Sequence, residues 1–476
     1  MSKYYITTTL PYVNAKPHIG FALEVIQADA VARYRRLMGD EVIFNTGTDE
    51  HGQKIFDKAQ AEGKDVQAYV DEYAAKFDDL KESLNLSYTH FIRTSDPDHK
   101  KAAQEFWKRC NDNGDIYKDQ YQVKYCVGCE LGKTESELVD GCCPDHPKME
   151  LELKDEENYF FRWSKYQQPL LDLYKERPDF VVPANRLKEI SNFVEAGLRD
   201  FSISRLKEKM PWGVPVPGDE DHVMYVWFDA LVNYISTLGW PETGGEFGEY
   251  WPGVQVAGKD NLRQQSAMWQ AMLMSAGVEP SRQVFIHGFI NSEGQKMSKS
   301  LGNVIDPFEE VSEYGVDAVR YYLLREIPSH DDGDFSRKRM EERYAELANQ
   351  LGNLVSRVAA MSIKYFDGAL DDVGTDWSEK EKALDEAMSD YDFKAYLDIV
   401  FSVVAEANDA VDKKAPFKLV KTDEAAAKQV LSEIAEQIRF VGRALTPIVP
   451  QTATEITRRY GKIIVQGEPL FPRRDT

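Results

Sequence analysis

Four side chains that commonly bind metals stand in two short motifs. Cys126-Val-Gly-Cys129 and Cys143-Pro-Asp-His146 each hold two ligands with two residues between them, and 13 residues separate the motifs. Thiolate and imidazole ligands at this spacing are typical of tetrahedral zinc, and four protein ligands leave no position open for catalysis. The sequence therefore predicts a structural Zn²⁺ ion that stabilises a small loop-rich segment. Cys142 is an alternative third ligand, although only Cys143 has the two-residue spacing to His146.

Two other motifs could act on phosphate groups. His18 stands in Pro17-His-Ile-Gly20, where a β-rich segment ends and a helix is predicted to begin. A helix N-terminus offers unpaired N–H groups and positive dipole character, so an imidazole donor there could bind a nucleotide phosphate. Far downstream, Lys296-Met-Ser-Lys-Ser300 places two lysines in a polar loop. Neither motif is specific by itself, because a single loop histidine more often has no ligand.

A third group of polar residues follows a predicted strand over residues 41–45. Asp49, Glu50 and His51 stand just after it. In an open α/β sheet, ligands bind at the carboxyl ends of the strands, so a carboxylate there could hold a substrate ammonium group. A helix cap is the alternative interpretation, because Thr-Asp and Asp-Glu pairs commonly begin helices.

Taken together, the His-Ile-Gly and Lys-Met-Ser-Lys-Ser motifs resemble the two signatures of class I aminoacyl-tRNA synthetases. Further segments extend the resemblance along nearly the whole chain, namely Thr46-Gly-Thr-Asp-Glu-His-Gly-Gln53, Tyr225-Val-Trp-Phe-Asp-Ala230 and Gly258-Lys-Asp260. The chain is most similar to the methionyl-tRNA synthetase family. The resemblance implies ATP-dependent attachment of L-methionine to tRNA(Met) through a methionyl-adenylate, with Mg²⁺ bound alongside ATP.

The resemblance also implies roles for individual residues. Catalysis would depend on His18, Lys296 and Lys299. ATP would contact His18, Gly20, Glu50, Lys296, Ser298 and Lys299. Methionine would lie among Leu10, Tyr12, Asp49, Trp227, Ala230, Tyr234, Asn261 and Gln265. The zinc ligands would be Cys126, Cys129, Cys143 and His146, and the anticodon would be read by Asn353, Arg357, Pro416 and Phe417.

Packing alone would explain several of these residues. Trp227, Ala230 (or Leu231) and Tyr234 recur at helical spacing, and such a stripe usually belongs to a core. The four anticodon residues are equally consistent with the architecture of a helical bundle. Family membership, rather than periodicity, is what favours binding roles for them.

The sequence departs from the family pattern at two places. Phe21 replaces the second histidine of the first signature, which removes one imidazole donor. Loss of such a donor can slow a reaction about a hundredfold, so we expect reduced or rewired catalysis. Asn261, Gln264 and Gln265 stand where the family usually has Ile, Phe and His, which predicts a more polar wall for the amino-acid pocket.

The elements that position these residues predict an α/β fold. Apolar spacing over residues 19–38, with Gly39 as a C-cap, indicates a helix between two strands. We expect a Rossmann-type parallel sheet over residues 1–115 and 223–304, split by a zinc-bearing connective insert over 116–222. Residues 305–340 would link it to the last part and support the Lys-Met-Ser-Lys-Ser loop. Successive helices over 341–476 predict an all-α helical bundle that binds the anticodon.

Composition sets outer limits on these expectations. A chain of 476 residues is too long for one ordinary core, and five cysteines, four of them crowded, suit metal binding in a reducing compartment. No apolar run approaches a membrane span, so we expect a soluble, cytoplasmic protein without membrane contacts.

The net charge of −22 argues against general nucleic-acid binding, so a tRNA partner requires a local basic groove. We expect a monomer, because the sequence lacks the additional C-terminal domain through which some relatives dimerise.

Two other functions remain possible from the sequence. One is a class I synthetase for another apolar amino acid, although the segment 116–222 is short for the large editing insert that the enzymes for Ile, Val and Leu usually carry. The other is a tRNA-binding paralogue without catalysis, which Phe21 and the Gln264–Gln265 pair would permit. The intact Lys-Met-Ser-Lys-Ser loop counts against the paralogue, and ATP consumption distinguishes it from an enzyme.

Overall fold

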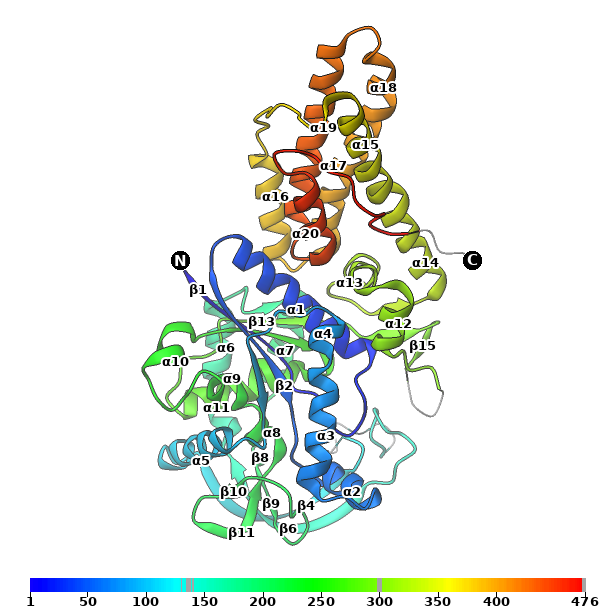
Figure 1. Ribbon diagram of the computed structural model, residues 1–476. Coiled ribbons are helices and arrows are strands. Elements are labelled where there is room, and N and C mark those ends of the chain that lie inside the picture. Colours follow the sequence, from blue (N-terminus) through cyan, green and yellow to red (C-terminus); the bar gives the residue numbers. More distant parts are fainter. Residues whose placement is uncertain (130, 134–137, 139–140, 298–301, 473–476) are drawn as a thin grey trace.

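A six-stranded parallel sheet forms the centre of the α/β part of the chain (Figure 1). The computed structural model describes residues 1–129, 131–133, 138, 141–297 and 302–472. Strand order is β3-β2-β1-β12-β13-β7, and every neighbouring pair is parallel. The strands are β1 (Lys3–Thr8), β2 (Glu41–Thr48), β3 (His90–Arg93), β7 (Val181–Val182), β12 (Val254–Gly258) and β13 (Gln283–His287). The direction of winding changes between β1 and β12, which is where doubly wound sheets bind ligands.

Helix α1 (Ile19–Leu37) connects β1 to β2 and confirms the predicted unit. It begins at His18 and ends just before Gly39, whose φ of 92° is readily adopted only by glycine. The remaining helices of the first part are α2 (Gln53–Ala61), α3 (Val66–Asp78), α4 (Leu80–Ser83) and α5 (Pro97–Asp112).

The segment predicted as an insert contains two small antiparallel sheets and also supplies part of the central one. One sheet has the order β5-β4-β6-β8, with β4 (Ile116–Cys126), β5 (Leu131–Lys133), β6 (Glu152–Phe161) and β8 (Phe201–Ser202). The other contains β9 (Ser204–Leu206), β10 (Pro215–Val216) and β11 (Asp219–Met224). Between them, α6 (Gln167–Glu176) and α7 (Ala184–Glu195) flank β7, which pairs with β13. The parallel sheet thus takes its edge strand from within residues 116–222. The sequence did not predict this strand, because β7 has only two residues and gives no strand pattern.

The second half of the sheet leads into short helical segments. These are α8 (Val226–Ala230), α9 (Asn233–Ser236), α10 (Gly245–Tyr250), a 3₁₀ turn (Lys259–Asn261), a π-helical turn (Gln264–Met268) and α11 (Trp269–Ser275). π-helical turns are rare in proteins, and many of those that occur lie at functional sites.

The last third of the chain is a linker followed by a helical bundle (Figure 1). Between β13 and the bundle lie β14 (Ile290–Ser292), β15 (Gln295–Lys296), α12 (Pro307–Tyr314), α13 (Val316–Arg325) and β16 (Gly333–Phe335), of which the last three fall within the predicted linker over residues 305–340. The bundle comprises α14 (Arg337–Glu346), a π-helical turn (Leu347–Gly352), α15 (Asn353–Phe366), α16 (Ser378–Ser389), α17 (Phe393–Lys414), α18 (Pro416–Leu419), α19 (Glu424–Ala444) and α20 (Pro450–Arg459). One apolar core runs continuously from β1 and α1 into α17 and α19, so the bundle is packed onto the α/β part.

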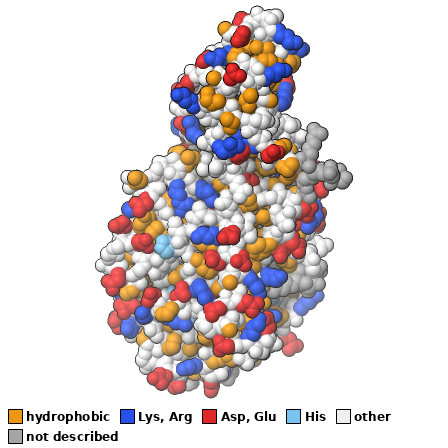
Figure 2. Space-filling model, viewed as in Figure 1, with side chains coloured by type: hydrophobic (Ala, Val, Ile, Leu, Met, Phe, Trp, Pro, Cys, Tyr) orange, Lys and Arg blue, Asp and Glu red, His pale blue; other side chains and the backbone are white. Residues whose placement is uncertain are grey.

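Surface charge is mixed on the face shown in Figure 2, where acidic and basic side chains alternate over the α/β part. Lys and Arg side chains stand beside apolar ones at the free end of the bundle. Among the described residues, no helix combines the length and the apolarity that crossing a membrane requires.

Candidate active site

A cavity of about 1160 Å³ opens at the carboxyl ends of the central strands. It brings together residues from the loops after β1, β2, β12 and β13 and from the first turn of α1. The predicted site residues that line it are Leu10, Tyr12, His18, Gly20, Asp49, Trp227, Ala230, Tyr234, Asn261 and Gln265. Residues that lie far apart in the sequence therefore share one open cavity, as expected from the sheet topology.

His18 lies at the N-terminus of α1. Its backbone is extended, and its ring Nδ1 accepts a hydrogen bond from the Gly20 N–H at 3.1 Å. A neutral ring that accepts through Nδ1 carries its proton on Nε2, so the imidazole has a donor in addition to capping the helix. A Cβ atom on Gly20 would lie 3.0 Å from this ring, which explains the need for glycine two residues after the histidine.

Asp49 lies at the carboxyl end of β2 and is 3% exposed. Its backbone N–H donates to the Pro11 carbonyl at 3.0 Å, and its carbonyl accepts from the Val13 N–H at 3.3 Å. These bonds hold the loop that carries Tyr12 against the loop that carries Asp49. A buried carboxylate beside a tyrosine can bind an ammonium group, because the charge of the ligand offsets the cost of burying the carboxylate.

Trp212 braces the loop that follows Asp49, although no sequence motif indicates it. Its indole Nε1–H donates to the Glu50 carbonyl at 2.6 Å, and its own carbonyl accepts from the Gly52 N–H at 3.2 Å. The loop reverses at Gly52, where φ is 117°. Two hydrogen bonds from one residue thus fix the path of the chain directly after Asp49.

The Glu50 side chain does not line the cavity. It is fully buried, and its two oxygens accept from Arg93 at 2.7 and 2.9 Å. Thr48 donates to the same carboxylate at 2.6 Å, and Ser95 donates to it as well. The structure therefore gives this side chain a role in holding β2 to β3, and contact with ATP stays a prediction from the sequence.

Glu24 and His287 form a buried ion pair in the cavity wall, and sequence reasoning missed both. The Glu24 Oε2 and His287 Nε2 atoms lie 3.0 Å apart, and the backbone N–H and hydroxyl of Thr9 donate to the other Glu24 oxygen at 2.7 and 2.5 Å. The pair joins α1, the loop after β1 and the end of β13. Burial alone would lower the pKa of His287, but the hydrogen bond and charge of Glu24 outweigh burial and raise the pKa above 6.5.

This pair predicts a measurable titration. The folded pKa of His287 lies above its unfolded value, so the stabilisation from the pair is fully present below about pH 6.5 and is lost as the pH rises through the folded pKa. NMR titration of the ring should give a pKa above 6.5. Glu24→Gln should lower that pKa, because burial then acts against only the weaker field of Asp260 and the Gly288 carbonyl. An unchanged pKa in the variant would contradict the assignment.

The polar residues of the pocket wall are mostly paired with one another. Gln265 is 1% exposed, donates through Nε2 to the Tyr234 hydroxyl at 2.8 Å and accepts from Gln255 at 3.1 Å. Gln270 and Ser281 complete a buried network behind it. Gln264 differs, because its buried Oε1 has no hydrogen-bond partner among the described residues. The wall is thus less polar toward a ligand at Gln265 than its composition predicts, whereas Gln264 and the partly exposed Asn261 keep polar groups at the cavity.

The metal-binding residues form one cluster at the edge of the same cavity. The ligand atoms of Cys126, Cys129, Cys143 and His146 all lie within 4.8 Å of one another. The Cys129 Sγ atom is 3.2 Å from both the Cys143 Sγ and the His146 Nδ1. This donor set can hold a metal ion, and Cys142 is not part of it.

One feature keeps the cluster compact and another joins it to α2. A Cβ atom on Gly128 would lie 2.4 Å from the His146 ring, so only glycine allows the histidine to approach. Lys54, on α2, donates to the Gly128 carbonyl at 2.9 Å. Gly128, Cys129 and His146 also line the cavity, so the metal-binding loop forms one of its walls.

Comparison with known proteins places the chain in a family. A sequence model of the family described as "tRNA synthetases class I (M)" matches residues 4–151 and 146–359. The methionine–tRNA ligase of Thermosynechococcus vestitus is 45% identical over 492 residues, which cover 99% of this chain and 93% of the relative. The chain belongs to the class I methionyl-tRNA synthetase family. The methionine–tRNA ligase of Brucella suis biovar 1 is 46% identical over 470 residues, covering 95% and 91% of the two chains.

Solved structures of the family agree in fold. Mycobacterium tuberculosis methionyl-tRNA synthetase in complex with methionyl-adenylate superimposes with a TM-score of 0.92 at 37% identity, covering 99% of this chain and 100% of that one. The apo form of that protein gives a TM-score of 0.86 at 33% identity, with 100% and 99% coverage.

The second signature of the methionyl-tRNA synthetase family is only partly described. Met297 lines the cavity, which places the start of the loop at the site. The backbone of Lys296 pairs with Asn291 in the β14–β15 hairpin. The side chain of Lys296 and the whole of Ser298 and Lys299 lie outside the described residues, so their roles stay predictions from the sequence.

The residues expected to read the anticodon gather around the junction between α17 and α18. Arg357, on α15, pairs with Asp412 near the end of α17 at 3.0 Å, and Asn353 begins α15. Pro416 is buried at the first turn of α18, whereas Phe417 is 39% exposed. An exposed aromatic ring beside lysines suits stacking on a base, although bundle packing accounts for Pro416 equally well.

Proposed function

We propose that this methionyl-tRNA synthetase activates L-methionine with ATP and transfers it to tRNA(Met). The observation that carries the proposal is the shared cavity, which Asp49, Tyr12 and the helix N-terminus that carries His18 all line. A carboxylate for the substrate ammonium and an imidazole donor for a phosphate are the groups that adenylation requires, and little covalent chemistry by the protein is needed.

In the first step, a carboxylate oxygen of methionine attacks the α-phosphorus of ATP. A bond from that oxygen to phosphorus forms, the bond from phosphorus to the bridging oxygen breaks, and pyrophosphate leaves. Asp49 holds the ammonium group, and His18 with the α1 N–H groups stabilises charge on the phosphates. Lys296 and Lys299 are proposed to neutralise the departing pyrophosphate. Mg²⁺ bound together with ATP would add positive charge at the phosphates.

In the second step, a hydroxyl of the 3′-terminal ribose of tRNA attacks the carbonyl carbon of the adenylate and AMP leaves. The bundle would hold the anticodon through Asn353, Arg357, Pro416 and Phe417, while the acceptor end enters the cavity. Lys413 and Lys414 in the last turn of α17 and Lys418 in α18 place basic side chains beside Phe417, which supports RNA binding by a protein of net charge −22. We propose that the enzyme works as a monomer in the cytoplasm.

Exchange of labelled pyrophosphate into ATP tests the function directly. The purified protein should support exchange with methionine and with none of the other nineteen amino acids. Exchange with a different amino acid would keep the class and overturn the specificity. A folded, zinc-loaded sample that supports no exchange would favour an RNA-binding protein without catalysis.

We further propose that the cysteine cluster holds Zn²⁺. Three sulfur atoms and one imidazole nitrogen within 4.8 Å of one another suit a tetrahedral ion with Zn–S bonds of about 2.3 Å. Four protein ligands make the ion structural, and it would keep Cys129 and His146 in place as part of the cavity wall.

Cys143→Ser should therefore remove most of the bound zinc, lower the melting temperature and slow pyrophosphate exchange. Cys142→Ser is the matched control, because the neighbouring cysteine lies outside the cluster and should keep the metal. Elemental analysis and thermal denaturation measure the two effects. Equal zinc loss in both variants would show that the cluster has been assigned wrongly.

Phe21 stands where the first family signature has its second histidine, and it packs as part of the cavity wall. Its ring packs edge-on against Phe77 at 5.5 Å, and both rings line the cavity. Phe21→His should raise the adenylation rate by at most about a hundredfold, because it restores a donor near the phosphates. Phe21→Leu loses the ring contact without adding a donor, so it should give no gain. An unchanged rate in Phe21→His would show that the position does not act on the reaction.

A further inference from the structure

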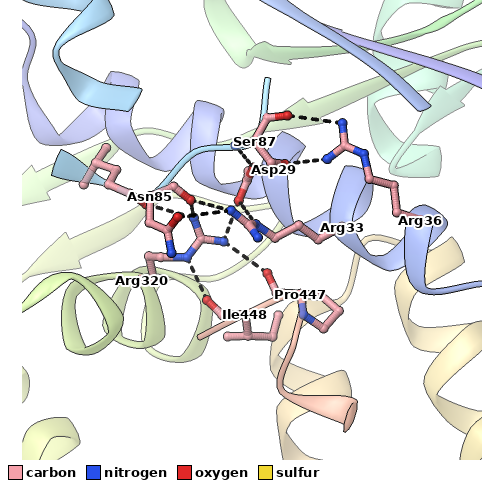
Figure 3. A network of polar contacts seen from close by, with 9 residues as sticks. Asp29, Arg33, Arg36, Asn85, Ser87, Arg320, Pro447 and Ile448 are labelled. Carbon is pink, nitrogen blue, oxygen red and sulfur yellow. Dashed lines mark hydrogen bonds and ion pairs between the residues drawn. The ribbon is translucent and has the colours of Figure 1, made fainter. Parts of the chain in front are cut away.

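Arg320, on α13, is completely buried where three parts of the chain meet (Figure 3). Its guanidinium has five N–H groups, and five acceptors surround it. Nε donates to the Ile448 carbonyl at 2.8 Å, and one terminal nitrogen donates to the Leu84 and Asn85 carbonyls at 3.1 and 3.5 Å. The other contacts the Asp29 carboxylate at 2.7 Å and the Pro447 carbonyl at 3.1 Å.

Asp29, on α1, is also completely buried and fully paired. One of its oxygens accepts from the Ser87 N–H and hydroxyl, both at 2.6 Å, and the other contacts Arg33 at 2.8 Å in addition to Arg320. Burial opposes ionisation of Asp29, but Arg320 and Arg33 hold its pKa below the usual value. Because both buried charges are paired, loss of either partner would leave an uncompensated buried charge, so the contact constrains the elements that carry it.

The two ends of this contact belong to different working parts of the molecule. Helix α1 runs from His18 at the cavity to Asp29 and beyond, whereas the Pro447–Ile448 turn joins α19 to α20 in the bundle. Arg320 itself belongs to the linker. Helix α19 has 21 residues, so it extends about 31 Å, and a tilt of about 10° at the turn would move its far end by about 5 Å.

We propose that Arg320 is a positioning residue for tRNA charging. By joining Asp29 of α1 to the Pro447–Ile448 turn, it sets the angle of the bundle, so that a tRNA bound by its anticodon presents its acceptor end to the cavity. The inference rests on the proposed function and adds a requirement for the second step that the first step does not share. Adenylation uses only small molecules and does not depend on the angle of the bundle.

Arg320→Lys is the test variant. Lysine keeps the charge beside Asp29, but its single ammonium group cannot span from that carboxylate to the two carbonyls of the turn as the planar guanidinium does. Other contacts should keep the bundle folded and attached in this variant, since Tyr391 stacks on Phe285 at 4.4 Å and Asp317 accepts from the Thr452 N–H at 2.6 Å. We expect kcat/KM for full-length tRNA to fall about tenfold or more. Pyrophosphate exchange and binding of an isolated anticodon stem–loop should stay within about twofold, far below that loss.

Arg36→Met is the matched control. Arg36 is also on α1 and donates to the Ser87 hydroxyl at 2.6 Å and the Ser87 carbonyl at 3.2 Å, within the α/β part alone. It should leave the ratio of charging to exchange unchanged. Should Arg320→Lys fail to fold, the double variant Asp29→Asn with Arg320→Met removes both charges together and loses the same contact to the turn.

Three outcomes separate the possibilities. Selective loss of charging in Arg320→Lys supports a positioning role. An equal fall in charging and exchange, or no fall in charging, overturns it. Wild-type protein without exchange would refute the proposed function instead, so the two failures are distinguishable.

Discussion

Replacing His18 by alanine should slow pyrophosphate exchange about a hundredfold or more. The ring lies at the N-terminus of α1 and lines the cavity, and its Nδ1 is occupied by the Gly20 N–H, which leaves Nε2–H as the donor. Removing one donor that stabilises transition-state charge has effects of this size. Because the proposed contact with the phosphates would strengthen as charge develops on them, kcat should fall while the KM for methionine changes little.

His18→Asn separates the chemistry of the ring from its role as a helix cap. Asparagine is among the best N-caps, so this variant keeps the cap and lacks the imidazole. We expect both variants to lose activity, but only His18→Ala to lose about 1 kcal/mol of stability. Full activity in His18→Asn would assign the residue a capping role alone. Steady-state kinetics and chemical denaturation provide the two measurements.

Replacing Asp49 by asparagine should lower kcat/KM for methionine about a hundredfold or more. The side chain is 3% exposed in the cavity wall, and an ammonium bound there would lose its only predicted counter-charge. The KM for ATP should change little, since the nucleotide does not carry the ammonium. The loss should therefore appear in the KM for methionine in exchange assays.

A methionine analogue without the amino group identifies the contact itself. Wild-type protein should bind methionine far more tightly than the desamino compound, whereas Asp49→Asn should bind the two with similar affinity. If the variant kept the full preference, Asp49 would not be the ammonium partner. Isothermal calorimetry gives all four affinities.

Features made by residues close together in the chain could be predicted from the sequence, because they depend on short spacing. The four metal ligands lie within one segment, and the structure brings the same four together and leaves Cys142 aside. The apolar pattern predicted residues 19–38 as a helix, and α1 spans Ile19–Leu37 with His18 at its N-terminus. The sequence placed His18 at the start of a helix and Asp49 at the end of a strand, and both residues line the cavity in the structure.

The tertiary structure decided which long-range partners these residues have. Glu24 and His287 lie 263 positions apart, and Arg320 meets the Ile448 carbonyl 128 positions away. The same holds for Glu50, whose carboxylate turns to Arg93, and for β7, which joins the sheet from within the predicted insert. Such pairs leave no periodic pattern, because sheet register and helix packing set them rather than local spacing. The sequence by itself thus determined the family and predicted the four residues of the candidate metal cluster and the position of the candidate site, and only the folded chain decided which buried charges surround that site.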